Sequence, residues 1–209
     1  MPERSAPSVD AARRRFDRWA GTYEKDRLSR WTAGLQKGAV EALGLRPSDR
    51  VLDLGCGTGQ AVRGAAGITE RAVGVDLSPA MIERARAWPG LPSNAEFRVG
   101  EAGEIPAKDS EFTAALCTNS FHHYPEPRAA IAELSRVLEP GGRLVIGDGC
   151  ADRWAARFAD RLLRAFEPGH VRLYRSVELG GMLYRSSFRE VEIRRLWDGG
   201  YMFVRGRKT

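Results

Sequence analysis

Cysteine, lysine and histidine are all scarce in this 209-residue sequence, which has three, four and three of them. The cysteines, at positions 56, 117 and 150, are widely spaced and form no Cys-x-x-Cys pair, so neither a zinc site nor a disulfide framework is indicated. No apolar run reaches the roughly 18 residues that suggest a membrane span. The first 16 residues lack the apolar core of a secretory signal. We therefore expect a cytoplasmic protein with reduced thiols, no membrane span and no metal.

The formal charge is +6, and only four of the 33 basic residues are lysines. A nucleic-acid-binding protein usually gathers its basic residues on one face. Here the arginines are scattered among acidic residues, and the only local clusters lie at 13–15 and 205–208. We interpret the excess as a solvated surface and expect no specific nucleic-acid partner. Binding to nucleic acid should be weak, and it should fall steeply with salt.

Short apolar runs alternate with helical patterns through the middle of the chain. The strand-like runs are 51–54, 72–75, 97–99, 114–118 and 143–147. The helical patterns between them include 79–87, where Ser78 and Pro79 are typical of a helix start, and 127–138, which ends at Glu139-Pro140-Gly141-Gly142. This alternation predicts an α/β fold with a parallel sheet covered on both faces.

Both ends of the chain differ from this pattern. Residues 10–43 are predicted to be helical, with Phe16, Trp19, Ala20 and Tyr23 on one face that either packs on the sheet or covers a ligand. Residues 152–166 and 176–184 are predicted helices, and 188–196 and 201–207 are predicted strands of an antiparallel hairpin. We expect one domain: a helical lid (about 1–43), a core (about 50–148), a helical substrate-side segment (about 150–186) and an edge hairpin (about 188–207).

The most informative motif is a glycine loop directly after the first strand. Three glycines alternate with other residues in Asp53-Leu54-Gly55-Cys56-Gly57-Thr58-Gly59, and Asp76 ends the next strand 21 residues after Gly55. Glycines let a ligand approach the backbone closely, and an acid at this position can bind ribose hydroxyls. The third glycine comes one residue earlier than in the dinucleotide fingerprint. Asp53 also suits a ligand with an amino group better than one with a pyrophosphate.

Five segments, in chain order, resemble the motifs of class I S-adenosylmethionine-dependent methyltransferases, in particular the type 11 and quinone-biosynthesis-like members. They include Asp53-Leu54-Gly55-Cys56-Gly57-Thr58-Gly59, Gly74-Val75-Asp76-Leu77-Ser78-Pro79, Gly100-Glu101-Ala102, Asn119-Ser120-Phe121-His122-His123-Tyr124 and Leu138-Glu139-Pro140-Gly141-Gly142. The resemblance covers about residues 50–148. It implies a Rossmann-like, doubly wound, mostly parallel seven-stranded sheet with the antiparallel hairpin at its edge, and S-adenosylmethionine as the cofactor.

The resemblance also implies which residues contact this cofactor. They are Asp53, Gly55, Cys56, Gly57 and Gly59 at the methionine part, Asp76 at the ribose, Leu77 and Met81 beside the adenine, Glu101 and Ala102 at its edge, Thr118 and Asn119 on the floor, and Tyr23 from the lid. The chain departs from the family at Glu101 and Thr113, where relatives usually carry aspartate. The first departure places the side-chain contact to adenine in doubt, and the second position is expected to be structural.

The sulfonium methyl is already activated, so the protein must mainly orient the acceptor and exclude water. A base helps only if the acceptor loses a proton, and His123, His122 and His170 are the candidates; each could instead be structural. We expect methyl transfer to a small, hydrophobic or aromatic acceptor. Its pocket is expected to lie under the N-terminal helix and the segment of about 150–184, whose aromatic residues would either line it or belong to the core: Phe16, Trp19, Trp31, Trp154, Phe166 and Tyr174. The alternatives are a catalytically silent binding module, an NAD-dependent oxidoreductase, and methylation of a nucleic acid or protein. Neither the Pro-Pro loop of base amino methyltransferases nor a Pro-Cys nucleophile occurs.

Overall fold

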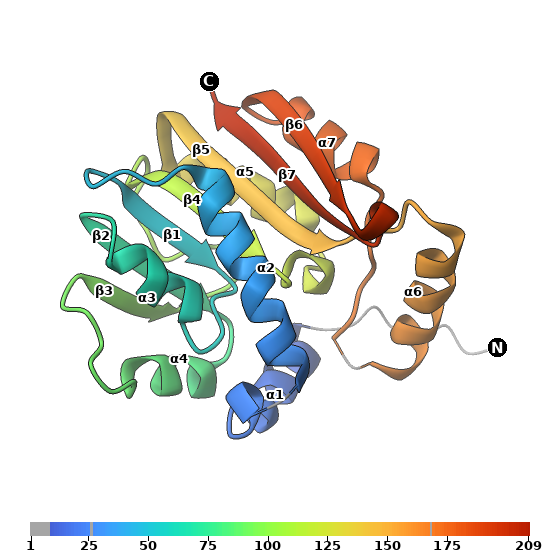
Figure 1. Cartoon of the computed structure of the whole chain (residues 1–209), viewed down its shortest axis with the longest axis horizontal. Helices are drawn as coiled ribbons and strands as arrows, with labels where there is room; N and C mark the ends of the chain where they lie inside the picture. Colours follow the sequence, from blue (N-terminus) through green and yellow to red (C-terminus); the bar gives the residue numbers. More distant parts are fainter. Residues whose placement is uncertain (1–8, 26, 168) are drawn as a thin grey trace.

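The computed structural model describes residues 9–25, 27–167 and 169–209, and its centre is one seven-stranded sheet (Figure 1). The strand order is β3-β2-β1-β4-β5-β7-β6. Neighbouring strands from β3 to β5 are parallel, and β7 pairs antiparallel with both β5 and β6. The strands are β1 Arg50–Leu54, β2 Arg71–Asp76, β3 Ala95–Val99, β4 Phe112–Thr118, β5 Leu138–Gly149, β6 Phe188–Leu196 and β7 Tyr201–Lys208. The predicted fold class is confirmed.

Helices cover both faces of the sheet, so its central strands are buried on both sides. The helices are α1 Val9–Trp19, α2 Arg27–Leu43, α3 Gln60–Ala66, α4 Pro79–Arg86, α5 Pro127–Val137, α6 Trp154–Phe166 and α7 Ser176–Arg185, with short 3-10 turns η1 Tyr23–Lys25, η2 Phe121–His123 and η3 Trp197–Gly199. One apolar core lies between the sheet and α2, α3 and α4. The second lies between the sheet and α5 and α7.

Helix α4 begins where Ser78 and Pro79 predicted a helix start. Ser78 is its N-cap, and its hydroxyl accepts a hydrogen bond of 3.1 Å from the Met81 amide. Pro79 occupies the first turn, where a missing amide hydrogen costs nothing. This cap fixes the direction in which the chain leaves β2, and so it fixes Asp76 at the C-terminal end of that strand.

Two features of the helices differ from the sequence-based expectation. The segment 10–43 is not one helix, because α1 ends at Trp19 and a 3-10 turn precedes α2. Helix α3, directly after the glycine loop, was not predicted; its four buried residues are Ala61, Val62, Ala65 and Ala66. Small apolar residues give a weak periodic signal, although they let α3 approach the sheet closely. In the part of the chain that the structure describes, no helix combines the length and apolar character that crossing a bilayer would need.

Candidate functional site

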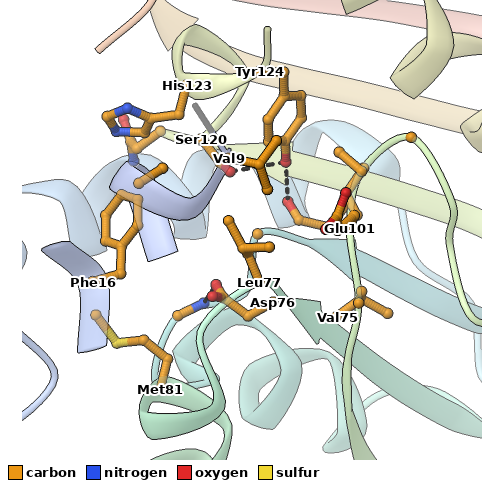
Figure 2. Close-up of a pocket in the computed structure, with 18 of the residues that line it drawn as sticks. Val9, Phe16, Val75, Asp76, Leu77, Met81, Glu101, Ser120, His123 and Tyr124 are labelled. Atoms are coloured by element: carbon orange, nitrogen blue, oxygen red, sulfur yellow. Dashed lines mark hydrogen bonds between the residues drawn. The ribbon is translucent and has the colours of Figure 1, made fainter. Parts of the chain in front are cut away.

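The candidate site is a cavity of about 340 Å³ at the C-terminal ends of β1, β2 and β4. In an open parallel sheet this edge is where ligands bind. Figure 2 shows the labelled side chains around the cavity, with Asp76 and Leu77 from the edge of β2, Phe16 from α1, and His123 and Tyr124 from the segment after β4. The site therefore combines a sheet edge with a helical cover.

The glycine loop supports the cavity through its backbone. Gly55 has φ +77°, and a Cβ atom there would lie 2.0 Å from the Ser120 hydroxyl oxygen, so no other residue fits. Gly57 has φ +53°, and the nearest atoms to a Cβ would be those of the Tyr23 ring at 3.9 Å. A side chain at Gly57 would therefore be both strained and directed toward the cavity.

Asp76 is held in place by backbone amides. Its two carboxylate oxygens accept hydrogen bonds from the amides of Gly57, at 2.8 Å, and Ser78, at 2.9 Å. Burial raises the pKa of Asp76, while these two hydrogen bonds act in the opposite direction. Each oxygen retains a further lone pair, so the carboxylate can still accept hydroxyl donors from a ligand.

Asp53 lies beneath the loop and is almost completely buried. Within the described part of the chain, neither of its carboxylate oxygens has a hydrogen-bond partner. Burial, and then the charge of Asp76, raise the pKa of Asp53 to about 8. A buried carboxyl group without partners is costly, and a donor from a ligand would remove that cost.

Two amide side chains of the cavity lining also carry unsatisfied groups. Asn119, directly after β4, has φ +53° in the left-handed region. Among the described residues, no group pairs with the Asn119 side-chain nitrogen or with the side-chain oxygen of Gln36 in α2. Backbone strain and orphaned polar atoms concentrate at functional sites, so both amides are candidates for ligand contacts.

His123 is the histidine that lines the cavity. Its Nδ1 lies 2.8 Å from the carbonyl oxygen of Gly169. Because a carbonyl can only accept, Nδ1 carries the proton and Nε2 keeps its lone pair. Burial, followed by the charge of neighbouring His122, places the pKa of His123 well below its ordinary value. The side chain is therefore a neutral base at physiological pH.

The other two histidines are absent from the lining and are held by acids. His122 Nδ1 lies 2.7 Å from an oxygen of Asp148. Burial lowers the pKa of His122, but the nearby Asp148 carboxylate has the larger effect, so the pKa of His122 is raised. His170 Nε2 lies 2.8 Å from Asp160, and burial lowers the pKa of His170. Both histidines therefore have carboxylate partners within the protein, which is the structural alternative expected for them.

Helix α1 covers one side of the cavity with Val9, Ala12 and Phe16. The hydroxyl of Ser78 donates a hydrogen bond of 2.5 Å to Asp17 of α1. The Phe16 ring meets the His123 ring edge to face, with centroids 5.0 Å apart. The helix thus contacts both the start of α4 and the candidate base.

A second contact joins α1 to the segment after α6. Arg15 forms an ion pair of 2.6 Å with Glu167. Gly169, with φ +88°, packs against Ala12 so closely that a Cβ atom would lie 3.0 Å from the Ala12 Cα. Because the Gly169 carbonyl also holds His123, the position of α1 and the orientation of the base depend on the same short segment.

The structure gathers most of the residues predicted from the sequence around one cavity. Those in the lining are Tyr23, Gly55, Gly57, Asp76, Leu77, Met81, Glu101, Ala102, Thr118, Asn119 and His123. Those outside it are Asp53, Cys56, Gly59, His122 and His170. The cavity is also lined by Gln36, Ser120 and Tyr124, to which the sequence motifs give no role. The signal for Ser120 and Tyr124 was their proximity to the histidine pair, whereas Gln36 lies among other polar residues of α2 and had no signal.

The expected contribution of residues 150–186 is not observed, because no described residue of that segment lines the cavity. Trp154 and Phe166 are exposed on α6, and Tyr174 is buried in the core. The side chain of Trp31 lies outside the described residues. Thr113 binds Asp49 and the Arg50 amide at the opposite end of the sheet from the cavity, which is the structural role expected for it.

Known proteins match this chain in sequence and fold. Residues 52–146 match the family described as "Methyltransferase domain". A 27-O-demethylrifamycin SV methyltransferase of Amycolatopsis mediterranei is 36% identical over 129 residues, which are 60% of this chain and 47% of that protein. A demethylmenaquinone methyltransferase of Tropheryma whipplei is 30% identical over 141 residues, 64% of this chain and 57% of that protein.

A solved geranyl diphosphate methyltransferase in complex with SAM has the same fold, with a TM-score of 0.69 at 20% identity over 85% of each chain. The chain spans about half the length of the curated relatives it matches. The matched segment contains the glycine loop and Asp76, and it ends within β5. Over residues 52–146 the chain is similar to methyltransferase domains, and S-adenosylmethionine is the cofactor that this similarity supports.

Proposed function

We propose that the protein transfers the methyl group of S-adenosylmethionine to a small-molecule acceptor, by in-line displacement, giving S-adenosylhomocysteine. The observation that carries this proposal is the single cavity that joins the glycine loop and Asp76 to an apolar cover and a neutral histidine. A shared cavity brings donor and acceptor together and excludes water, which is the main catalytic requirement for this reaction.

The cofactor end has groups that fit this ligand. The backbone at Gly55 and Gly57 would hold the methionine part, with Tyr23 beside it. The buried and unpartnered Asp53 would face the amino group across the loop, and the free lone pairs of Asp76 would accept the ribose hydroxyls.

The remaining lining residues would contact the adenine and the floor. Leu77 and Met81 would flank the ring, Glu101 and Ala102 would lie at its edge, and Thr118 and Asn119 would form the floor. When bound, the cofactor supplies an activated methyl group on a sulfonium. Cys56 and Gly59 support the loop from behind: a Cβ at Gly59 would lie 2.4 Å from the Phe97 ring.

The acceptor end combines apolar surface with one base. Val9, Ala12 and Phe16 provide an apolar cover, which suits a hydrophobic or aromatic molecule. His123 Nε2 would take the proton that an acceptor hydroxyl or acidic carbon loses during attack. The names of two relatives specify small organic acceptors, demethylrifamycin SV and demethylmenaquinone, and this supports the same class of acceptor here.

We further propose that α1 acts as a lid, and deletion of residues 1–19 tests this. The deletion should abolish turnover because it uncovers the cavity, and it should lower the melting temperature only modestly because Ala12 is the buried residue of α1. Circular dichroism before and after heating measures the second effect. Collapse of the fold would instead make α1 a core helix.

The overall proposal is tested by calorimetry followed by an acceptor screen. S-adenosylhomocysteine should bind and NADH should not, which separates a methyltransferase from an oxidoreductase. Labelled cofactor is then incubated with small aromatic and hydrophobic molecules, with RNA and with protein. Transfer to a small molecule supports the proposal. Transfer to a macromolecule, or cofactor binding with no transfer to any acceptor, would contradict it.

A further inference from the structure

Helix α6, Trp154–Phe166, attaches to the protein through its polar face. Asp160, its buried residue, accepts hydrogen bonds from His170 Nε2 at 2.8 Å and from the Leu173 amide at 2.6 Å. Arg157 donates to the carbonyl oxygen of Asp152 at 3.1 Å. This is the reverse of an ordinary surface helix, which turns its apolar face toward the core.

The apolar face of α6 consequently points to solvent. Four large apolar residues recur at every fourth position and form one stripe: Trp154, Phe158, Leu162 and Phe166, with 74%, 59%, 47% and 82% of their surface exposed. Steps of four residues rotate by about 40° each, so the stripe covers an arc of about 120°. Figure 1 shows α6 at the side of the sheet domain, and it makes only sparse backbone contacts with the other described elements.

The charged side chains that α6 exposes to solvent are all arginines. Arg153, Arg157, Arg161 and Arg164 occupy its polar side, and the one acidic residue among 153–166 is the buried Asp160. The chain as a whole carries a formal charge of +6. A surface that combines exposed tryptophan and phenylalanine with flanking arginines is complementary to an anionic, partly apolar partner.

We propose that α6 binds the surface of an anionic lipid membrane, lying in its plane. The aromatic stripe would enter the boundary between headgroups and acyl chains, while the arginines would contact lipid phosphates. With 13 residues, or about 20 Å of length, α6 is too short to span a bilayer and suits an interfacial position.

A second copy of the chain fits this face less well. A symmetric contact through α6 would juxtapose two helices that each present Arg157 and Arg161, which have no acidic partner among the described residues, and these like charges would repel. Arg153 and Arg164 already have acidic partners, since Arg153 pairs with Asp198 of the β6–β7 turn at 3.4 Å and Arg164 pairs with Asp160 at 2.6 Å. The lipid surface is therefore the occupant that both the apolar stripe and the charge favour.

The proposal does not depend on methyl transfer, and vesicle sedimentation tests it on the full chain. Vesicles of phosphatidylcholine alone are compared with vesicles that contain about 30% phosphatidylglycerol. The test variant is Trp154→Ser with Phe158→Ser and Phe166→Ser. The matched control is Ile68→Ser with Val99→Ser, which removes exposed apolar residues elsewhere on the surface. Because all five side chains are exposed, circular dichroism should show both variants folded.

We expect the wild type and the control to bind anionic vesicles, with at least tenfold weaker binding to neutral vesicles and at least tenfold weaker binding by the triple variant. Raising the salt from 0.1 to 1 M should release the protein, because it screens the arginines. Three results would overturn the proposal: no binding to anionic vesicles, equal binding by the triple variant, or equal binding to neutral vesicles. If the wild type does not bind vesicles but self-associates, and the triple variant does not self-associate, the apolar face of α6 binds a second copy of the chain instead.

Discussion

Replacing Asp53 by asparagine should make the protein more stable. The carboxyl group is buried without a partner among the described residues, and its pKa is raised to about 8 from the ordinary 3.8. Between these two pH values the folded protein holds a proton that the unfolded chain has lost. Stability therefore falls as pH rises through this window, and it falls by about 1.4 kcal/mol per pH unit.

At pH 7 the penalty is about 4 kcal/mol, since about three pH units separate the ordinary pKa from pH 7. Asparagine has nearly the same shape as aspartate and does not ionise, so the Asp53→Asn variant does not have this pH-dependent penalty. For a chain of this length, 1 kcal/mol corresponds to roughly 2–4 °C, so we expect the melting temperature to rise on the order of 10 °C. The rise should be small at pH 5 and largest near pH 8.

Differential scanning fluorimetry between pH 5 and pH 8 provides the measurement, with Glu70→Gln, an exposed position, as the control. The same substitution should weaken binding of S-adenosylhomocysteine, because Asp53 is proposed to face its amino group. A melting temperature that is unchanged, or that keeps the wild-type dependence on pH, would refute the assignment of a strained carboxyl at position 53. Unchanged cofactor affinity would refute only its proposed role in binding.

Three other predictions concern the cavity. Asp76→Ala should weaken S-adenosylhomocysteine binding by about 1.5–3 kcal/mol in calorimetry, because hydrogen bonds to a charged acceptor are lost; equal affinity would remove Asp76 from the site. Gly57→Val should also weaken binding, while Gly64→Ala, in open space on α3, should leave binding intact and raise the melting temperature. His123→Ala should reduce turnover by roughly 10²–10⁴ with cofactor affinity unchanged. Since the pKa of His123 is lowered, wild-type turnover should persist below pH 6.5, and loss of activity on an acid limb above that pH would contradict a neutral base.

The sheet and the part of the cavity proposed to bind the cofactor were predictable because their signals are local in sequence. The glycine loop, Asp76 and the cap at Ser78 each depend on neighbours within a few residues, and the strand–helix alternation then determines which strand ends meet. The hairpin was also predictable, because its two strands flank one short turn. These features do not require knowledge of distant contacts.

The orientation of α6 could not be predicted in this way. Its amphipathic pattern shows two faces but not which one turns inward, and the aromatic residues Trp154 and Phe166 were therefore expected over the cavity. The observed orientation depends on Asp160, which meets His170 and the Leu173 amide only after the connecting segment has folded back. The position of Gln36 in the cavity lining could not be predicted for a similar reason, because it depends on how α2 packs on the sheet.

The weak attachment of α1 separates access to the cavity from the stability of the fold. Ala12 is the buried residue of α1, and Phe16, Arg15 and Asp17 make partly buried contacts, whereas the central strands are buried on both faces. Because detachment of α1 uncovers few buried groups, we expect it to cost a small fraction of the free energy of global unfolding. Its amides should exchange with solvent deuterium through this local opening, at a rate that stabilising the sheet does not change. With α1 as the proposed lid, ligand exchange would then proceed many times within the lifetime of one folded molecule.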